Sequence, residues 1–171
     1  KLQQKKSNKM IKRQLEIKLR DLVKKYPVIT LTGHRQSGKT TLLKHVFPDY
    51  DYVTLEDPDM RRYASEDGRG FLSQYKNGVI IDEVQRIPDL FSYIQGIVDD
   101  ADEPGMFILS GSQNFLLLRS ISQSLAGRAS VLYLMPFTKR ELEANKPISL
   151  KEFTANGIIE AEEYNFYKAV F

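Results

Sequence analysis

Hydrophobic residues in this chain alternate between short β-branched runs and longer stretches with a helical repeat. Short runs that predict strands lie at residues 28–32, 50–55, 78–83, 106–114 and 129–134. The run at 28–32 is apolar or β-branched on both faces, which is typical of a central strand in a parallel sheet. Because helical stretches separate these runs, the pattern predicts an α/β fold.

The helical stretches have start and stop signals at their ends. Apolar residues from Ile11 to Tyr26 recur at spacings of three and four, and Pro27 stops this first helix. Asp57 is placed to cap a helix that begins at Pro58. Further helices are expected at residues 39–47, 59–77 (one or two short helices), 88–98 and 115–126.

The C-terminal part of the chain is predicted to be helical. Thr138 is followed three residues later by Glu141, which is the pattern of a capping box at a helix start. Two further helical stretches are expected near 149–155 and 160–171, and the last has no stop signal. The expected organisation is a flexible basic leader at 1–9, a core domain at 10–137 and a helical segment at 138–171 that begins a lid or a following domain.

A loop of the pattern G-x-x-x-x-G-K-[ST] joins the first strand to the next helix. Its glycines allow backbone angles that other residues resist, so that N–H groups can surround a phosphate. Lys39 is expected to reach the β- and γ-phosphates of a nucleotide, and the Thr40 hydroxyl to bind Mg²⁺. The alternative is an ordinary glycine-containing turn with a surface lysine. The expected phosphate-binding residues are Gly33, His34, Arg35, Gln36, Ser37, Gly38, Lys39, Thr40 and Thr41.

Two carboxylates follow a β-branched run at residues 79–81. At the carboxyl end of a strand this is the Walker B pattern, in which Asp82 would hold Mg²⁺. Glu83 lies one residue further, where it can polarise an attacking water. The alternative is a pair of acids that caps the next helix.

Small polar residues end the strand that begins at Met106. A polar side chain at this point can touch the γ-phosphate or the attacking water, and Ser112 is the first candidate and Gln113 the second. The alternative is that residues 110–114 only form a turn and cap the next helix.

The composition is that of an ordinary globular protein of 171 residues, with 42% hydrophobic and 27% charged residues. No apolar run approaches the ~20 residues of a membrane span. The absence of cysteine excludes disulfides and thiolate metal sites, and a cytoplasmic location is expected.

The net charge of +3 is unevenly distributed along the chain. Residues 1–25 hold ten Lys or Arg and two acids, or +8, so the rest of the chain carries −5. This arm either contacts nucleic acid or is a solvated helix face behind a disordered leader. No aromatic residue lies among the basic ones before Tyr26, which favours the solvated face.

Taken together and in order, these motifs resemble the prokaryotic ATPases of the AAA superfamily known as the AAA-14 type. The resemblance covers about Ile11 to Leu142. It is carried by residues 33–41, Leu55-Glu56-Asp57-Pro58, Ile80-Ile81-Asp82-Glu83-Val84-Gln85, Leu109-Ser110-Gly111-Ser112-Gln113-Asn114, Ser124-Leu125-Ala126-Gly127-Arg128 and Met135-Pro136-Phe137-Thr138.

The resemblance implies a three-layer fold with a five-stranded parallel sheet in the order 5-1-4-3-2 and helices on both faces. It also places Arg128 where related ATPases have an arginine finger, which acts on a neighbouring subunit or in cis. The alternative for Arg128 is a cation that satisfies the last carbonyls of a helix. Members commonly carry a further C-terminal domain. The loop departs from the family at His34 and Ser37, where Pro and Val or Ala are commoner, but it keeps both glycines and the Lys-Thr pair.

The leading hypothesis is Mg²⁺-dependent binding and slow hydrolysis of ATP, with Glu83 orienting the water and Lys39, Arg128 and Ser112 assisting. The alternative is a nucleotide-gated switch with negligible turnover that binds a partner protein or nucleic acid. A small-molecule kinase fits less well, because no Arg-rich lid is visible and the pair Asp82–Glu83 favours water as the acceptor. A module that binds nucleic acid through the basic arm is the fourth hypothesis.

Overall fold

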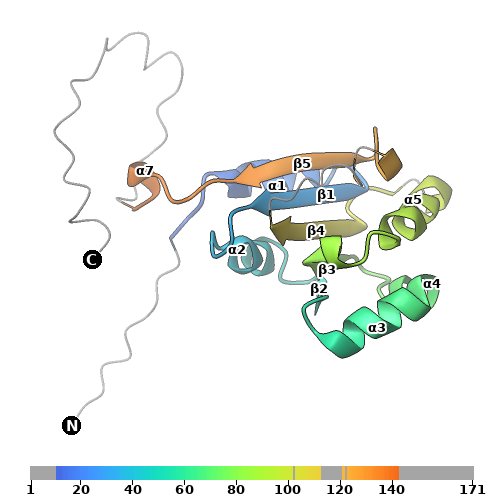
Figure 1. The fold of residues 1–171 in the computed structure, drawn as a ribbon. Coiled ribbons are helices and arrows are strands. Elements are labelled where there is room, and N and C mark those ends of the chain that lie inside the picture. The colour runs from blue at the N-terminus through green and yellow to red at the C-terminus, as the bar shows by residue number, and fades with distance from the viewer. Residues whose placement is uncertain (1–10, 102, 113–120, 122, 143–171) are drawn as a thin grey trace.

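A twisted parallel sheet lies at the centre of the computed structural model, which describes residues 11–101, 103–112, 121 and 123–142 (Figure 1). Its strand order is β2-β3-β4-β1-β5, and every neighbouring pair is parallel. This is the order expected from the family resemblance, read from the opposite edge. The strands are β1 (Val28–Gly33), β2 (Asp51–Thr54), β3 (Val79–Asp82), β4 (Phe107–Ser112) and β5 (Ala129–Leu134).

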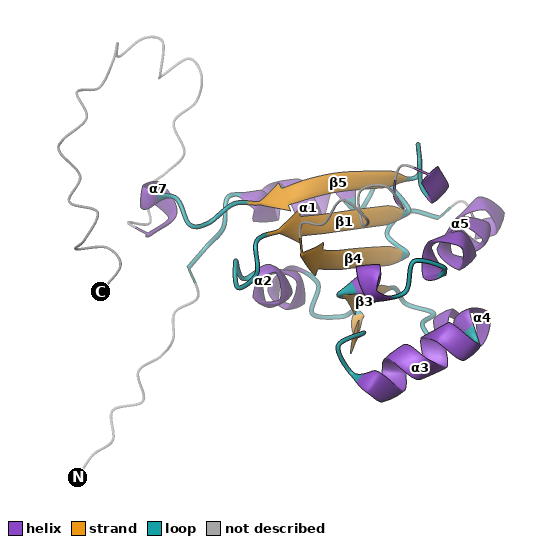
Figure 2. Cartoon of the chain, in the orientation of Figure 1, coloured by secondary structure: helices purple, strands orange, loops and turns teal. Residues whose placement is uncertain are grey.

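Helices cover both faces of the sheet, so the molecule has three layers (Figure 2). The described helices are α1 (Leu15–Leu22), α2 (Lys39–Val46), α3 (Pro58–Glu66), α4 (Gly68–Ser73), α5 (Leu90–Ala101) and α7 (Lys139–Leu142), with a 3₁₀ turn, η1 (Val84–Arg86). No helix in the described ranges is both long enough and apolar enough to cross a bilayer.

Alternate residues of each inner strand enter two different hydrophobic cores. Ile29 and Leu31 of β1 pack with Leu19 of α1 and with α2, in what we call the α1–α2 core. Val28 of β1 faces the other way and joins a core that includes residues of α3, α4 and α5, here called the α3–α5 core. Successive strand residues point to opposite faces, which explains why the inner strands have apolar residues at consecutive positions.

The helices predicted from Ile11, Lys39, Pro58 and Pro88 are present, but several of their boundaries differ from the prediction. The side chain of Asp57 accepts hydrogen bonds from the N–H groups of Asp59 and Met60 at the start of α3. Asp67 ends α3 and caps α4, which divides the predicted stretch 59–77 into two helices.

The first helix is shorter than expected at both ends, because it begins at Leu15 rather than near Ile11 and ends at Leu22 rather than near Tyr26. Arg13 and Gln14 instead form hydrogen bonds to Glu141, far away in the sequence. Helix α5 runs three residues beyond the predicted end, to Ala101. The predictions for residues 1–9, 113–120, 149–155 and 160–171 lie outside the described residues.

The register of β1 sets the position of the loop that follows it. Gly33 lies beside Ser112 of β4 on one side and Leu134 of β5 on the other. A Cβ atom added to Gly33 would lie 2.5 Å from the backbone oxygen of Leu134, closer than real contacts allow. Glycine is therefore required here by the close approach of β5 at the point where the chain leaves the sheet.

We expect Gly33→Ala to lower the free energy of unfolding by about 1–3 kcal/mol, because the new methyl group must displace the backbone of β5. Gly96→Ala is the matched control, since a Cβ at Gly96 in α5 meets nothing within 4 Å. It should raise the free energy of unfolding by up to about 1 kcal/mol, the gain in helix propensity. Urea unfolding followed by circular dichroism measures both, and equal effects of the two substitutions would contradict this account.

Candidate functional site

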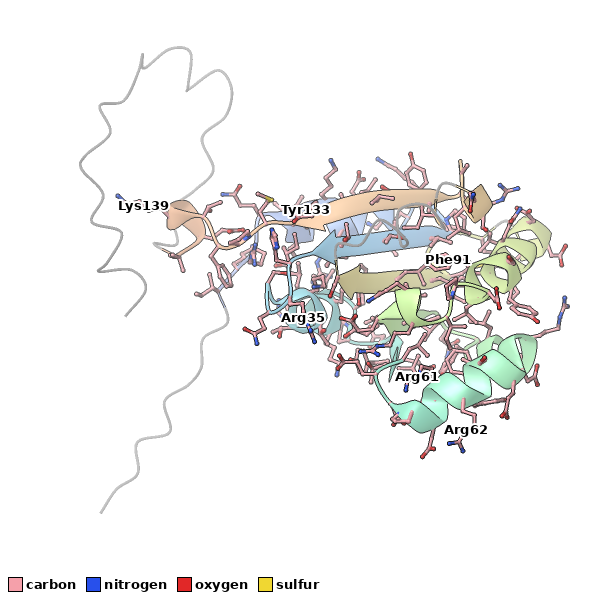
Figure 3. The ribbon with its side chains drawn as sticks, viewed as in Figure 1. Arg35, Arg61, Arg62, Phe91, Tyr133 and Lys139 are labelled. Atoms are coloured by element: carbon pink, nitrogen blue, oxygen red, sulfur yellow. The ribbon has the colours of Figure 1, made fainter. Side chains whose placement is uncertain are left out.

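A cleft of about 600 Å³ opens at the carboxyl end of the sheet. The phosphate-loop motif and Glu83 meet there, although they lie far apart in the sequence. Figure 3 shows the side chains of this region, with Arg35 labelled beside the start of α2. The residues that line the cleft are Arg35, Gln36, Gly38, Lys39, Thr40, Thr41, Glu56 and Glu83.

The loop between β1 and α2 has the backbone geometry of an anion-binding turn. Gln36 and Gly38 have φ angles of 60° and 87°, in the left-handed region. A Cβ at Gly38 would meet nothing within 4 Å, so this glycine is needed for its conformation and not for space. Helix α2 begins at the next residue, and the positive end of its dipole is therefore beside the loop.

Lys39 is almost fully buried at the start of α2, with 6% of its surface exposed. Its ammonium group donates hydrogen bonds to the carbonyl oxygens of His34 at 2.8 Å and Gly33 at 3.1 Å. The side-chain oxygen of Ser37 is buried and has no hydrogen-bond partner among the described residues. The loop thus holds a positive charge and an unused polar group.

Asp82 is the centre of a hydrogen-bond cluster that joins three strands and α2. Its Oδ2 accepts a hydrogen bond from the Thr40 hydroxyl at 2.7 Å and one from the Tyr52 hydroxyl at 3.1 Å. Its Oδ1 accepts a hydrogen bond from the Ser110 hydroxyl and one from the N–H of Glu83. Asp82 is only 7% exposed, and these four donors compensate for the water that its carboxylate has lost.

Glu83 has an unusual backbone conformation directly after β3, with φ 55° and ψ 39°. Such angles are uncommon for a residue other than glycine. They direct the chain into η1 and leave the side chain in the lining of the cleft. Its Oε2 accepts a hydrogen bond from the side-chain amide of Gln85, which restricts the orientation of the carboxylate.

Ser112 lies at the last position of β4, opposite Gly33 in the register. It is half-buried and adjacent to the start of the phosphate loop, but it is not among the residues that line the cleft. Its alternative candidate, Gln113, lies outside the described residues.

Arg128 does not line the cleft. It precedes β5, and β5 extends from beside Val28 to beside Gly33, a distance of about 17 Å at ~3.3 Å per residue. Its guanidinium donates to both carboxylate oxygens of Asp99, with Nη2 at 2.9 Å from Oδ2. In this arrangement Arg128 is held away from the cleft of its own chain. The hydrogen bond from its Nη1 to the carbonyl of Ala126, at 3.1 Å, suits the alternative role of a helix-terminal cation.

Sequence reasoning missed Tyr52 and Ser110, which contact Asp82 from neighbouring strands. Ile81 pairs with Leu109, and the next residues along the two strands, Asp82 and Ser110, are hydrogen-bonded to each other. Thr54 of β2 lies beside Asp82, which brings Tyr52 within reach of the same carboxylate. The signal that could have identified both residues is the register of the sheet, which a single sequence does not contain.

A family model of AAA domains, AAA_14, matches residues 25–143. The chain belongs to this AAA_14 family. Uncharacterized proteins of Mycobacterium tuberculosis and Mycobacterium bovis are each 37% identical to it over 134 residues. The match covers 77% of this chain but only 30% of these relatives, so the chain spans less than a third of their length.

Solved structures share the fold of this AAA_14 domain at low sequence identity. A Walker-type ATPase of Pyrococcus abyssi has a TM-score of 0.56 at 18% identity, covering 77% of this chain and 55% of its own. The AMPPCP-bound DnaA of Aquifex aeolicus has a TM-score of 0.52 at 16% identity, covering 87% and 51%. The P-loop NTPase domain of a sigma-54 activator from E. coli has a TM-score of 0.52 at 13% identity, covering 73% and 94%. The domain therefore has the P-loop NTPase fold.

The pKa of Tyr52 should depend on the charge of Asp82. Burial of the phenol, followed by the charge and hydrogen bond of Asp82, raises the pKa of Tyr52 to about 12 from an ordinary 10.0. Because the folded-state pKa is raised, the stability that neutral Tyr52 provides is complete below pH 10 and is lost as the pH rises toward about 12. We expect an ultraviolet titration of the wild type minus that of Tyr52→Phe to give a phenol with a midpoint near pH 12.

Asp82→Asn is the control for this titration, because it removes the charge but keeps a side chain of the same shape. The pKa of Tyr52 should then move toward its ordinary value. A difference titration of the wild type centred near pH 10 would contradict the contact between Tyr52 and Asp82.

Proposed function

We propose that this AAA_14 domain binds ATP together with Mg²⁺ and hydrolyses it slowly. The observation that carries the proposal is the hydrogen bond of 2.7 Å between the Thr40 hydroxyl and the Asp82 carboxylate, at a cleft that Lys39 and Glu83 also line. Each of these side chains has the chemistry that a nucleoside-triphosphate site needs: a cation for phosphate, two oxygen donors for a metal and a carboxylate for water. The choice of ATP over other nucleotides rests on the family.

The donor set fits Mg²⁺. This ion usually keeps several waters and takes one or two protein ligands together with phosphate oxygens. The described residues contain no cluster of three or more His, Cys, Asp or Glu, as a site built wholly from protein would need. Thr40 and Asp82 match the smaller set and would hold the ion. Once bound there, Mg²⁺ would neutralise charge on the phosphate oxygens.

The side chains around the cleft have separate roles in the proposed reaction. The loop amides and Lys39 bind the phosphates, and Glu83, oriented by Gln85, positions a water beside the γ-phosphorus. The water oxygen forms a bond to phosphorus as the bond to the β–γ bridging oxygen breaks, which yields ADP and phosphate. Ser112 contacts the γ-phosphate at the end of β4.

A nucleotide-gated switch with negligible turnover is the second candidate function. The position of Arg128 favours the switch function for an isolated chain. Arg128, the proposed arginine finger, is held by Asp99 at the end of the sheet that is remote from the cleft. Without a neighbour to supply this cation, the domain would bind nucleotide and hydrolyse very little. The two candidates therefore differ in turnover and agree on binding.

We expect Glu83→Gln to retain ATP binding and to lower the rate of hydrolysis by about 10²–10⁴-fold, the usual contribution of a positioned general base. Calorimetric titration measures binding, and phosphate release measures turnover. Lys39→Ala should abolish binding itself, because it removes the cation of the loop. Glu66→Gln, an exposed acid on α3, is the control and should change neither quantity. An unchanged rate in Glu83→Gln would exclude the role of Glu83.

Arg128 should act on the cleft of a neighbouring subunit. The rate per protomer should then rise with protein concentration, and Arg128→Ala should lower it by about 10³–10⁵-fold. Arg69→Ala, an exposed arginine on α4, is the matched control.

Mixing two inactive variants tests whether Arg128 of one subunit acts on the cleft of another subunit. Glu83→Gln supplies Arg128, and Arg128→Ala supplies Glu83, so their mixture should regain hydrolysis if the finger acts between subunits. A rate per protomer that is independent of concentration, with no recovery in the mixture, would leave Arg128 as a structural cation of its own chain.

A further inference from the structure

Arg13 is buried at the meeting point of three segments that are distant in the sequence. It precedes α1, yet only 5% of its surface is exposed. Its Nη1 donates to the carbonyl of Ser37 at 3.3 Å, its Nη2 to the carbonyl of Met135, and its Nε to Oε1 of Glu141 at 3.1 Å. Figure 1 shows α7 beyond the carboxyl end of β5, the end of the sheet at which α2 begins.

Glu141 holds Arg13 in this position. Its Oε1 accepts hydrogen bonds from Arg13 and from the N–H of Gln14, and its Oε2 accepts one from the N–H of Thr138 at 2.9 Å. Burial alone would raise the pKa of the Glu141 carboxyl, but the hydrogen bonds from Thr138 and Gln14 and the charge of Arg13 outweigh it and lower this pKa. Glu141 is therefore charged at neutral pH and paired with a buried cation. The capping box that the sequence predicts thus has a second partner far away in the sequence.

The contact with Ser37 concerns the phosphate loop directly. The carbonyl of Ser37 and the N–H of Gly38 belong to one planar trans peptide, so they point in opposite directions. Arg13 binds this carbonyl and is not among the residues that line the cleft, whereas Gly38 is. We therefore expect the N–H of Gly38 to point toward the cleft. That N–H is one of the donors with which a loop of this type binds phosphate.

We propose that Arg13, held by Glu141, is a positioning residue for the phosphate-binding loop, and that it links nucleotide affinity to the placement of α7. The inference rests on the proposed nucleotide binding and adds a device outside the sequence motifs. Because coupling between two sites is reciprocal, an α7 docked on Arg13 favours nucleotide binding, and bound nucleotide favours the docked α7.

Arg13→Lys tests the proposal, because lysine keeps the charge but lacks the planar fork that reaches three acceptors. We expect the Kd for ADP and for ATP to rise on the order of tenfold, as for the loss of one hydrogen bond to a charged group. Glu141→Gln should raise the Kd in the same direction. Arg20→Lys is the matched control, since Arg20 also pairs with a carboxylate and a carbonyl, Glu16 and Val46, at the far end of α2. Its Kd should equal that of the wild type.

The titrations are made well below the melting temperature of each variant, so that a loss of stability alone leaves the Kd unchanged. If the wild type binds nucleotide and folded Arg13→Lys binds it with the same Kd, the inference is overturned and the proposed function is left intact. No binding by the wild type would overturn both.

Hydrogen exchange on the wild type covers the case in which Arg13→Lys fails to fold. Saturating ADP should slow amide exchange in residues 138–142 as well as in the loop. Protection of the loop without any change in 138–142 would overturn the link to α7.

Discussion

The buried carboxylate of Asp82 is the interaction on which the site depends. A charge that has lost its water must be satisfied by donors, and here the donors come from β2, α2, β4 and the chain directly after β3. The same requirement therefore fixes the distance between the phosphate loop and the carboxyl end of β3. It also places Glu83, because the N–H of Glu83 is one of the four donors.

Patterns within one segment predicted the strands, the caps at Asp57 and Thr138, and the two nucleotide motifs, because each depends on neighbours along the chain. The strand order came from the family resemblance and is confirmed by the sheet. The contacts of Tyr52 and Ser110 with Asp82 depend on the register between strands, and the pairing of Arg13 with Glu141 joins residues 128 positions apart. No local pattern contains such information, and for this reason the second partner of a correctly predicted capping box was missed.

The polarity of a parallel sheet also explains the separation of Arg128 from the cleft. Loops that follow strands meet at one edge, and residues that precede strands meet at the opposite edge. A residue directly before β5 therefore lies far from a cleft built after β1 and β3, whatever its chemistry. If the proposed reaction needs Arg128, the topology requires that a second molecule supply it.

The division of the interior into two cores has a consequence for how the domain can vary. The sheet backbone separates the α1–α2 core, which supports the phosphate loop, from the α3–α5 core. Substitutions without shared neighbours are nearly additive in their effect on stability. Helices α3 to α5 can therefore be repacked and their outer surfaces changed with little disturbance of α2. Ile81 and Val84 flank Asp82 and Glu83 and belong to the α3–α5 core, so they are the positions at which such repacking would reach the cleft.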